Sequence, residues 1–344
     1  MPAFGRPKPT YDYNLSDEIQ NLDLLFTNRN VPQGNQPSKL LLASWNIANL
    51  GDQKRSDNDL KLIAHILSRF DLIAVQEVKG NYLNFKKVVD FMNGGFKFIF
   101  SDTAGNNERL AFVYRENKVK LGELFAEVAI PSKDYIKKTV VVPWTFRREK
   151  RAETFYDQIF TAFDRNPFVG TFSCENLDFM IANVHLYYGA KRNSKTSEDR
   201  AKYVRRVLEV YTLSNWAKKR ARSKSSYDND IILVGDMNIP EMKKNDFAYK
   251  ALKSSGLQPV NFYSNTGGSN LNNDKTYDQL AMTPGNLKNR IVRQDVFDFD
   301  NGIFRDLWDT AEIERPKKPA VYFNKYMRAY VSDHRPLWLQ LDVE

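Results

Sequence analysis

The sequence predicts an α/β (α+β) protein in which two β-sheets pack together and helices flank them. Three observations support this fold class. Short apolar runs, typical of buried strands, alternate with segments whose apolar residues recur at helical spacing. The connections between strands have lengths typical of antiparallel neighbours. No segment repeats at a fixed period, which argues against a repeat architecture.

The first 38 residues are expected to form a partly ordered extension that lies on a main domain of residues 39–344. They are polar and interrupted by prolines, and their one strong helix candidate is 15–26. From Lys39 the pattern changes to alternating strands and helices. The expected strands are 40–45, 72–75, 96–101 and 110–114, and the expected helices are 59–70 and 82–92.

Residues 125–165 are expected to form an irregular insertion, rich in charged and aromatic residues. Its segment 144–151 interleaves aromatic and basic side chains. This pattern suits either contact with a phosphate backbone and stacked bases, or a solvated helix flank. After the insertion we expect strands at 167–173, 179–185, 231–234, 279–282 and 337–341, a long helix from Thr196, and a charged loop over 218–230.

Composition favours partners that carry phosphate. Lys and Arg outnumber Asp and Glu by 51 to 42, and the net charge of +9 suits DNA or RNA. No apolar run is long enough for stable insertion into a membrane. The single cysteine, Cys174, excludes an internal disulfide and fits a cytoplasmic location, or a secreted one if a signal segment has been removed. Nothing in the sequence indicates an oligomeric state.

Two polar residues follow the first two strands of the main domain. Asn46 comes directly after strand 40–45, and Glu77 follows strand 72–75. A hard divalent cation such as Mg²⁺ needs a carboxylate and few other protein oxygens, because water and substrate phosphate complete its coordination. A glutamate fixed at a strand end fits that task. The alternative is that Glu77 is a carboxylate at a helix N-terminus, which the helix dipole favours.

Asp236 and Asn238 follow the apolar run 231–234. In an extended strand, residues two apart point the same way, so both side chains would reach the same space. A carboxylate and an amide placed together are suited to orienting a water molecule for attack. The alternative is an ordinary turn, because Gly-Asp-x-Asn is favourable turn chemistry.

The chain has three histidines, and two of them stand at the ends of apolar runs or beside expected strands. His185 ends one strand, and His334 follows Asp333 just before the last strand. Asp278 also precedes a strand, and an aspartate paired with an imidazole fixes its tautomer and stabilises its protonated form. A purely structural role is the alternative for His185. His65 lies on the polar side of its helix and has no predicted role.

These sites fall at the C-terminal ends of apolar runs, where binding sites form in layered α/β folds. The strings that carry the sites, together with two further matching segments, are Ser44-Trp45-Asn46-Ile47, Val75-Gln76-Glu77-Val78, Glu108–Arg115, Arg165-Asn166-Pro167, Val234–Asn238, Tyr277-Asp278-Gln279 and Ser332–Pro336. With these strings in this order, the chain resembles the endonuclease/exonuclease/phosphatase superfamily and, within it, deoxyribonuclease I. The matches span residues 40 to 341.

The resemblance implies a four-layered sandwich of two mixed β-sheets covered by helices, with the site at one end. It implies that Asn46, Glu77 and Asp333 hold Mg²⁺, with Mn²⁺ or Ca²⁺ as alternatives. The resemblance further implies that His334, paired with Asp278, acts as general base or stabilises the transition state. It implies that His185, paired with Glu108, protonates the leaving 3′-oxygen. Asp236 and Asn238 would orient the water or the phosphate, and Arg165 would clamp the phosphate.

The chain departs from the family pattern at several points. Ala48 stands where the abasic-site repair enzymes carry an acidic residue, which argues against that subgroup. The disulfides of secreted vertebrate deoxyribonuclease are absent. The loop before Glu108, residues 101–107, is shorter than the minor-groove loop of the family and lacks its arginine and tyrosine. The insertion 125–165 is also atypical of the family.

Three functions follow from these patterns. The first is a Mg²⁺-dependent phosphodiesterase, an endonuclease that cleaves DNA with low sequence specificity. The second keeps the fold and acts on a phospholipid, a phosphoinositide or a nucleotide. The third is a non-catalytic module that binds nucleic acid. This last hypothesis fits less well, because every matched catalytic position carries a competent residue.

Overall fold

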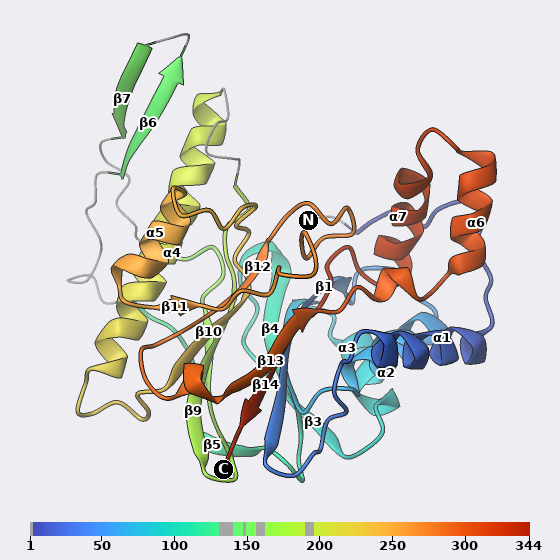
Figure 1. The fold of residues 1–344 in the computed structure, drawn as a ribbon, viewed down its shortest axis with the longest axis horizontal. Helices are drawn as coiled ribbons and strands as arrows, with labels where there is room; N and C mark the ends of the chain where they lie inside the picture. Colours follow the sequence, from blue (N-terminus) through green and yellow to red (C-terminus); the bar gives the residue numbers. More distant parts are fainter. Residues whose placement is uncertain (1–2, 131–139, 147–148, 156–161, 190–195) are drawn as a thin grey trace.

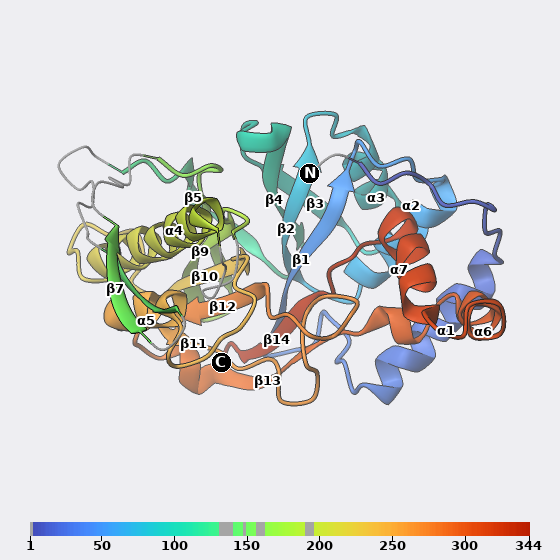
Figure 2. The same cartoon turned by 90° about the horizontal axis from the view of Figure 1, so that it is seen from above.

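Two six-stranded mixed sheets pack together, and helices cover both outer faces, as Figure 1 shows. The computed structural model describes residues 3–130, 140–146, 149–155, 162–189 and 196–344. Seen from above, the helices lie on the two outer sides, with the sheets between them (Figure 2). The predicted fold class, a four-layered sandwich, is confirmed.

The first sheet has the strand order β13-β14-β1-β2-β4-β3, in which β1 and β2 are parallel. Its strands are β1 (Lys39–Leu50), β2 (Leu72–Lys79), β3 (Phe96–Phe100), β4 (Glu108–Arg115), β13 (Ile291–Val296) and β14 (Leu337–Asp342). Five helices pack on its outer side: α1 (Leu15–Asn28), α2 (Asp57–Leu67), α3 (Leu83–Phe91), α6 (Arg305–Glu314) and α7 (Pro319–Tyr330).

The second sheet has the strand order β11-β12-β10-β9-β8-β5, in which β9 and β10 are parallel. Its strands are β5 (Lys120–Glu127), β8 (Phe168–Cys174), β9 (Leu177–His185), β10 (Ile231–Asp236), β11 (Gln258–Pro259) and β12 (Asp278–Met282). Its outer face is covered by α4 (Ser197–Ala221) and α5 (Phe247–Ser254).

Alternation along the strands divides the apolar residues among three cores. On β1, Leu41, Ala43 and Trp45 pack with the helices of the first sheet, while Leu40 and Leu42 join the core between the sheets. Successive side chains of a strand point to opposite faces, so one strand serves two cores. Strands buried on both faces read as continuous apolar runs, as the sequence of β1 does.

Every expected strand and helix occurs, and most strands are longer than predicted. The side chain of Thr196 caps α4 by accepting a hydrogen bond from the backbone N–H of Asp199 at 3.1 Å. The charged segment 218–230 is a loop only beyond α4, which continues to Ala221. Outside the insertion, the α-helices and strands that were not predicted are α5, α6, α7, β5, β11 and β13.

The atypical insertion contains a hairpin. Strands β6 (Val140–Phe146) and β7 (Glu149–Phe155) pair antiparallel, so the helix-flank interpretation of residues 144–151 is wrong. Arg147 and Arg148 lie outside the described residues, and the hypothesis of a nucleic-acid contact there stays a prediction. The hairpin stands beyond the upper end of α4 (Figure 1).

Helix α1, in the segment before β1, packs against the first sheet and its other helices. Leu22 and Phe26 of α1 are buried in the core that the first sheet forms with its helices. Among the helices of the described residues, none combines the length and apolar character that crossing a bilayer requires.

Candidate active site

Strand register places three of the predicted residues side by side. Asp236 ends β10, where it pairs with His185 of parallel β9 on one side and with Asp278 of antiparallel β12 on the other. Gly235 precedes it with φ +140°, and a Cβ atom there would lie 2.1 Å from the Val184 carbonyl oxygen. Only glycine therefore allows β10 to approach β9 this closely.

The first sheet contributes Asn46 and Glu77 from its parallel strands. Pairing of β1 with β2 shifts register after Asn46, and Glu77 has a left-handed backbone with φ +62°, which is uncommon for a glutamate. The Asn46 Nδ2 atom donates to Glu77 Oε1 and to Asp236 Oδ2, both at 3.0 Å. This amide therefore joins the ends of the two sheets. Because α3 begins only at Leu83, the helix N-terminus interpretation of Glu77 is wrong.

His185 is backed by Glu108. The His185 Nδ1 atom lies 2.9 Å from Glu108 Oε2, and buried Lys79 donates to the other carboxylate oxygen at 2.9 Å. Burial alone would raise the pKa of Glu108, but His185, Arg165 and Lys79 lower it to about 2. Glu108 is therefore ionised at neutral pH and fixes the orientation of the imidazole.

His334 is backed by Asp278 in the same way. The His334 Nδ1 atom lies 2.8 Å from Asp278 Oδ2. Trp45 Nε1 donates to the His334 carbonyl oxygen at 2.7 Å, which anchors the loop that carries the imidazole. Burial would lower the pKa of His334, yet Asp278 and Asp236 raise it well above its ordinary value. The imidazolium form is thus favoured at neutral pH.

Asp236 lies between the two imidazoles. Its Oδ2 atom is 3.5 Å from His185 Nε2 and 3.8 Å from His334 Nε2. Burial would raise the pKa of Asp236, but the two histidines and its hydrogen bonds lower it. Each histidine therefore has one ring nitrogen facing its own carboxylate and the other facing the shared Asp236.

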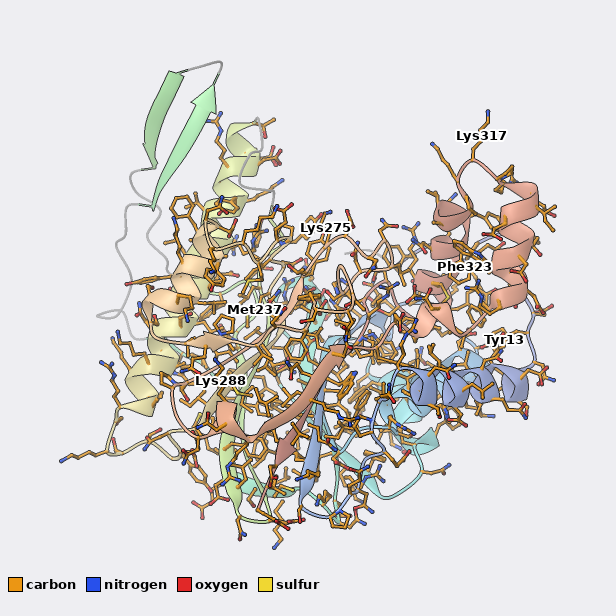
Figure 3. The ribbon with its side chains drawn as sticks, in the orientation of Figure 1. Tyr13, Met237, Lys275, Lys288, Lys317 and Phe323 are labelled. Atoms are coloured by element: carbon orange, nitrogen blue, oxygen red, sulfur yellow. The ribbon has the colours of Figure 1, made fainter. Side chains whose placement is uncertain are left out.

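Asn238 reaches the site through a turn. Its backbone N–H donates to Asp236 Oδ1 at 2.8 Å and its φ is +52°, so the turn interpretation is correct and strand alternation does not place the side chain. The Asn238 side-chain amide donates to the Leu186 carbonyl oxygen at 2.8 Å. Met237, between the two polar residues, is buried in the core that α4 and α5 cover (Figure 3).

Eight of the ten predicted residues line one pocket of about 970 Å³. Its walls carry Glu77, Glu108, Arg165, His185, Asp236, Asn238, Asp333 and His334. Asn46 and Asp278 lie directly behind them through hydrogen bonds to Asp236 and His334. A pocket of this size holds a ligand larger than one phosphate group.

The donor set fits a divalent cation. Within the described residues, ligand atoms within 4.8 Å of one another form two groups: Glu77, Glu108 and His185, and Asp236, Asp278 and His334. The Asn46 Oδ1 atom, on the residue that contacts Glu77, is buried and accepts no hydrogen bond within the described part of the chain. An unsatisfied buried oxygen beside a carboxylate is what a hard cation would satisfy.

Asp333, the third predicted metal ligand, lines the same pocket. Burial raises the pKa of Asp333, His334 lowers it, and the charges of Glu77 and Asp236 raise it further. Carboxylates that oppose one another's ionisation are stabilised together by a bound cation. Asp333 belongs to neither of the two groups of ligand atoms, so its place beside Asn46 and Glu77 as a metal ligand stays a proposal.

Arg165 lines the pocket and makes its hydrogen bonds within the protein. Its Nε and Nη2 atoms donate to the carbonyl oxygens of His185 and Leu186 at 2.8 and 3.0 Å. Its Nη1 atom lies 3.5 Å from Glu108 Oε2 and 3.3 Å from Asp164 Oδ2. The guanidinium is buried and holds Glu108 and the His185 loop in place, and its role as a phosphate clamp stays a prediction.

Several pocket residues were not predicted. They are Phe4, Asn106, Asp164, Tyr187, Tyr188, Gly189, Asp199, Lys202, Arg205, Tyr277 and Arg328. A signal existed for Tyr187 and Tyr188, which follow His185 directly, and for Tyr277, which precedes Asp278. No local pattern pointed to Phe4 or Arg328, which come from opposite ends of the sequence.

Glu209 of α4 is buried behind the pocket wall. Its carboxylate accepts hydrogen bonds from the backbone N–H groups of Tyr187 at 2.6 Å and Asp164 at 3.3 Å, and both residues line the pocket. Burial raises the pKa of Glu209 to about 7, although these hydrogen bonds oppose the shift.

We expect Glu209→Gln to flatten the dependence of stability on pH. Folded Glu209 stays protonated up to about pH 7, whereas an unfolded glutamate ionises near pH ~4.3. Between these values the unfolded chain binds fewer protons, so the free energy of unfolding falls as pH rises, by at most about 3 kcal/mol. Urea unfolding from about pH 5 to about pH 8 measures this fall. Glu198→Gln, at an exposed glutamate of the same helix, is the control. Identical pH profiles for Glu209→Gln and the unsubstituted protein would contradict the prediction.

The chain is similar in fold and in sequence to known proteins. No protein-family model matches the chain. In structure, the chain is similar to an endonuclease/exonuclease/phosphatase family protein from Bacteroides thetaiotaomicron, with a TM-score of 0.51 and 19% identity over 89% of this chain and 95% of that one. The two proteins share the fold. Together with the sequence relatives, this match confirms the resemblance to that superfamily.

In sequence, the chain is similar to deoxyribonucleases. It is 29% identical over 209 residues to a deoxyribonuclease from Thioalkalivibrio sp. strain K90mix, covering 58% of this chain and 46% of the relative. It is 36% identical over 89 residues to deoxyribonuclease-1 from Homo sapiens, covering 23% of this chain and 32% of the relative. The chain thus spans less than half the length of these curated relatives.

Proposed function

We propose that this protein is a Mg²⁺-dependent phosphodiesterase that cleaves DNA as an endonuclease of low sequence specificity. One observation carries the proposal: two imidazoles, each backed by its own carboxylate, converge on Asp236 in a pocket that also holds Glu77. Phosphodiester hydrolysis needs such proton-transfer groups beside carboxylates that hold a cation. The similarity to proteins named deoxyribonuclease supports DNA as the substrate.

The residues divide the work of hydrolysis. Ionised Asp236, with Asn238, orients the attacking water and accepts the proton that the water loses. His185, held by Glu108, protonates the leaving 3′-oxygen. The raised pKa of His334 supports its role as an imidazolium that stabilises the transition state over that of a general base.

Asn46, Glu77 and Asp333 would hold the cation. Bound Mg²⁺ would supply stabilisation for the charge that develops on the phosphate oxygens. Three carboxylates of the pocket, Glu77, Asp236 and Asp333, would repel the scissile phosphate without a bound cation between them. The proposed activity is therefore expected to require the metal.

Supercoiled plasmid tests the proposal. Purified protein with Mg²⁺ should convert it to nicked circles, and EDTA should stop the conversion. A parallel preparation of His185→Ala controls for contaminating nuclease. Phospholipid vesicles and a nucleotide phosphoester serve as alternative substrates. DNA that stays intact with Mg²⁺, Mn²⁺ and Ca²⁺ would refute the proposal, and turnover of the vesicles alone would redirect it to a lipid.

A further inference from the structure

Four arginine and lysine side chains line the pocket, and they differ in their partners. They are Arg165, Lys202, Arg205 and Arg328. The first three lie within ion-pair distance of carboxylates: Arg165 near Glu108 and Asp164, Lys202 near Glu198, and Arg205 near Asp164. Across the described ranges of the chain, Arg328 has no carboxylate within 4.0 Å. It is the pocket cation whose charge is not neutralised by such a neighbour.

Arg328 is held in place by an aromatic ring. Its Cζ atom lies 4.6 Å from the ring centroid of Phe4, which also lines the pocket. Buried Gln53 fixes Phe4 through both ends of its amide: Phe4 N–H donates to Gln53 Oε1 at 2.8 Å, and Gln53 Nε2 donates to the Phe4 carbonyl oxygen at 3.0 Å. A guanidinium stacked on a ring keeps its in-plane N–H groups available for another partner.

The segment that carries Phe4 is attached to the helix that carries Arg328. Tyr326 and Tyr330 lie on α7 on either side of Arg328 in sequence. Tyr326 Oη donates to the Pro9 carbonyl oxygen at 2.8 Å, and Tyr11 N–H donates to Tyr330 Oη at 3.0 Å. Figure 1 shows the segment before α1 passing α6 and α7 toward the middle of the molecule. Residues 3–13 and α7 thus form one unit at the rim of the pocket.

We propose that Arg328 binds a phosphate of the substrate strand next to the scissile one, and that Phe4 positions it. This inference rests on the proposed function, because it needs a substrate with more than one phosphate. The pocket of about 970 Å³ has room beyond the reacting group. The planar fork of an arginine matches two phosphate oxygens, and the partly exposed Arg328 side chain is free to make that contact.

Two variants and one matched control test the inference. Arg328→Gln removes the charge, and Phe4→Leu removes the ring beneath it. Arg305→Gln is the control. The Cζ atom of Arg305 lies 5.5 Å from the ring centroid of Trp308, so Arg305 also stacks on a ring, but it does not line the pocket. The substrates are a single-stranded oligonucleotide and methyl 4-nitrophenyl phosphate, a diester with one phosphate. Thermal unfolding confirms that each variant is folded.

We expect Arg328→Gln to raise KM for the oligonucleotide about tenfold and to change kcat less than about twofold, because the lost contact is equal in the ground and transition states. Hydrolysis of the small diester should not change. Binding of the oligonucleotide with Mg²⁺, measured in proteins that also carry His185→Ala so that cleavage is slow, should lose about one unit of its salt slope, as the loss of one phosphate contact requires. Phe4→Leu should shift KM and the slope in the same direction by less, and Arg305→Gln should match the unsubstituted protein.

Each contrary outcome has a separate meaning. If the unsubstituted protein cleaves DNA and Arg328→Gln has the same KM and salt slope, the inference is wrong and the proposed function stands. An equal loss of kcat on both substrates would place Arg328 at the scissile phosphate and also overturn the inference. Binding without cleavage would refute the proposed function, while the salt slope would still decide the role of Arg328. Neither binding nor cleavage would refute both.

Discussion

Replacement of either pocket histidine by alanine should lower kcat on DNA roughly 10²- to 10⁴-fold, as loss of a proton donor or of a preorganised charge does. His185 and His334 each have one ring nitrogen within 2.9 Å of a carboxylate and the other directed toward Asp236. Alanine removes the proton donor in one case and the positive charge in the other. Either loss acts on the transition state more than on binding, so KM should change little.

The chain offers a matched control for this experiment. His65 is the third histidine, and its Nε2 atom lies 2.8 Å from Asp23 at the surface, away from the pocket. His65→Ala should retain full activity. The double variant His185→Ala/His334→Ala should have a kcat only a little below that of the less active single variant, because the effects of groups that act in one step do not add. Full activity in both single variants would remove the catalytic assignment.

The site was predictable from sequence because its residues sit at strand ends. A strand end is marked by the close of an apolar run, and the edges of neighbouring strands meet in space. This reasoning identified Glu77, His185 and Asp236 before any coordinates, and the structure brings them together. It did not identify Lys79, although Lys79 follows Glu77 by two residues on β2 and contacts Glu108 at 2.9 Å. In a regular strand residues two apart lie on the same face, so the spacing between Glu77 and Lys79 could have indicated Lys79.

The role of Arg165 was not predictable in this way. A guanidinium near a site binds whichever acceptors surround it, and here these are carbonyl oxygens of residues 185 and 186, about twenty residues along the chain. Phe4 and Arg328 are harder still, because the contact joins residues more than three hundred positions apart and depends on the packing of α7. α7 itself could have been found, since Phe323, Met327 and Tyr330 recur at helical spacing.

Asp236→Asn should have the second large effect, a fall in kcat of roughly 10²- to 10³-fold, the size expected when a preorganised charge is lost from an active site. Both pocket imidazoles face the Asp236 carboxylate. Asparagine keeps the size of the side chain and its acceptor for the Asn238 N–H group, but removes the charge. Its new amide would face the Asn46 amide that donates to Asp236, so thermal unfolding must accompany the kinetics.

The same substitution has a readout that does not depend on catalysis. The charge of Asp236 raises the pKa of His334, so Asp236→Asn should lower that pKa and reduce the imidazolium fraction at neutral pH. With three histidines in the chain, proton NMR in EDTA can follow each imidazole, with His65 as the internal reference. Asp23→Asn is the matched control, because it removes a carboxylate from beside the surface His65 and should leave kcat unchanged. An unaltered His334 titration together with a large loss of kcat would show that Asp236 acts through the attacking water or the cation alone, not through the charge on His334.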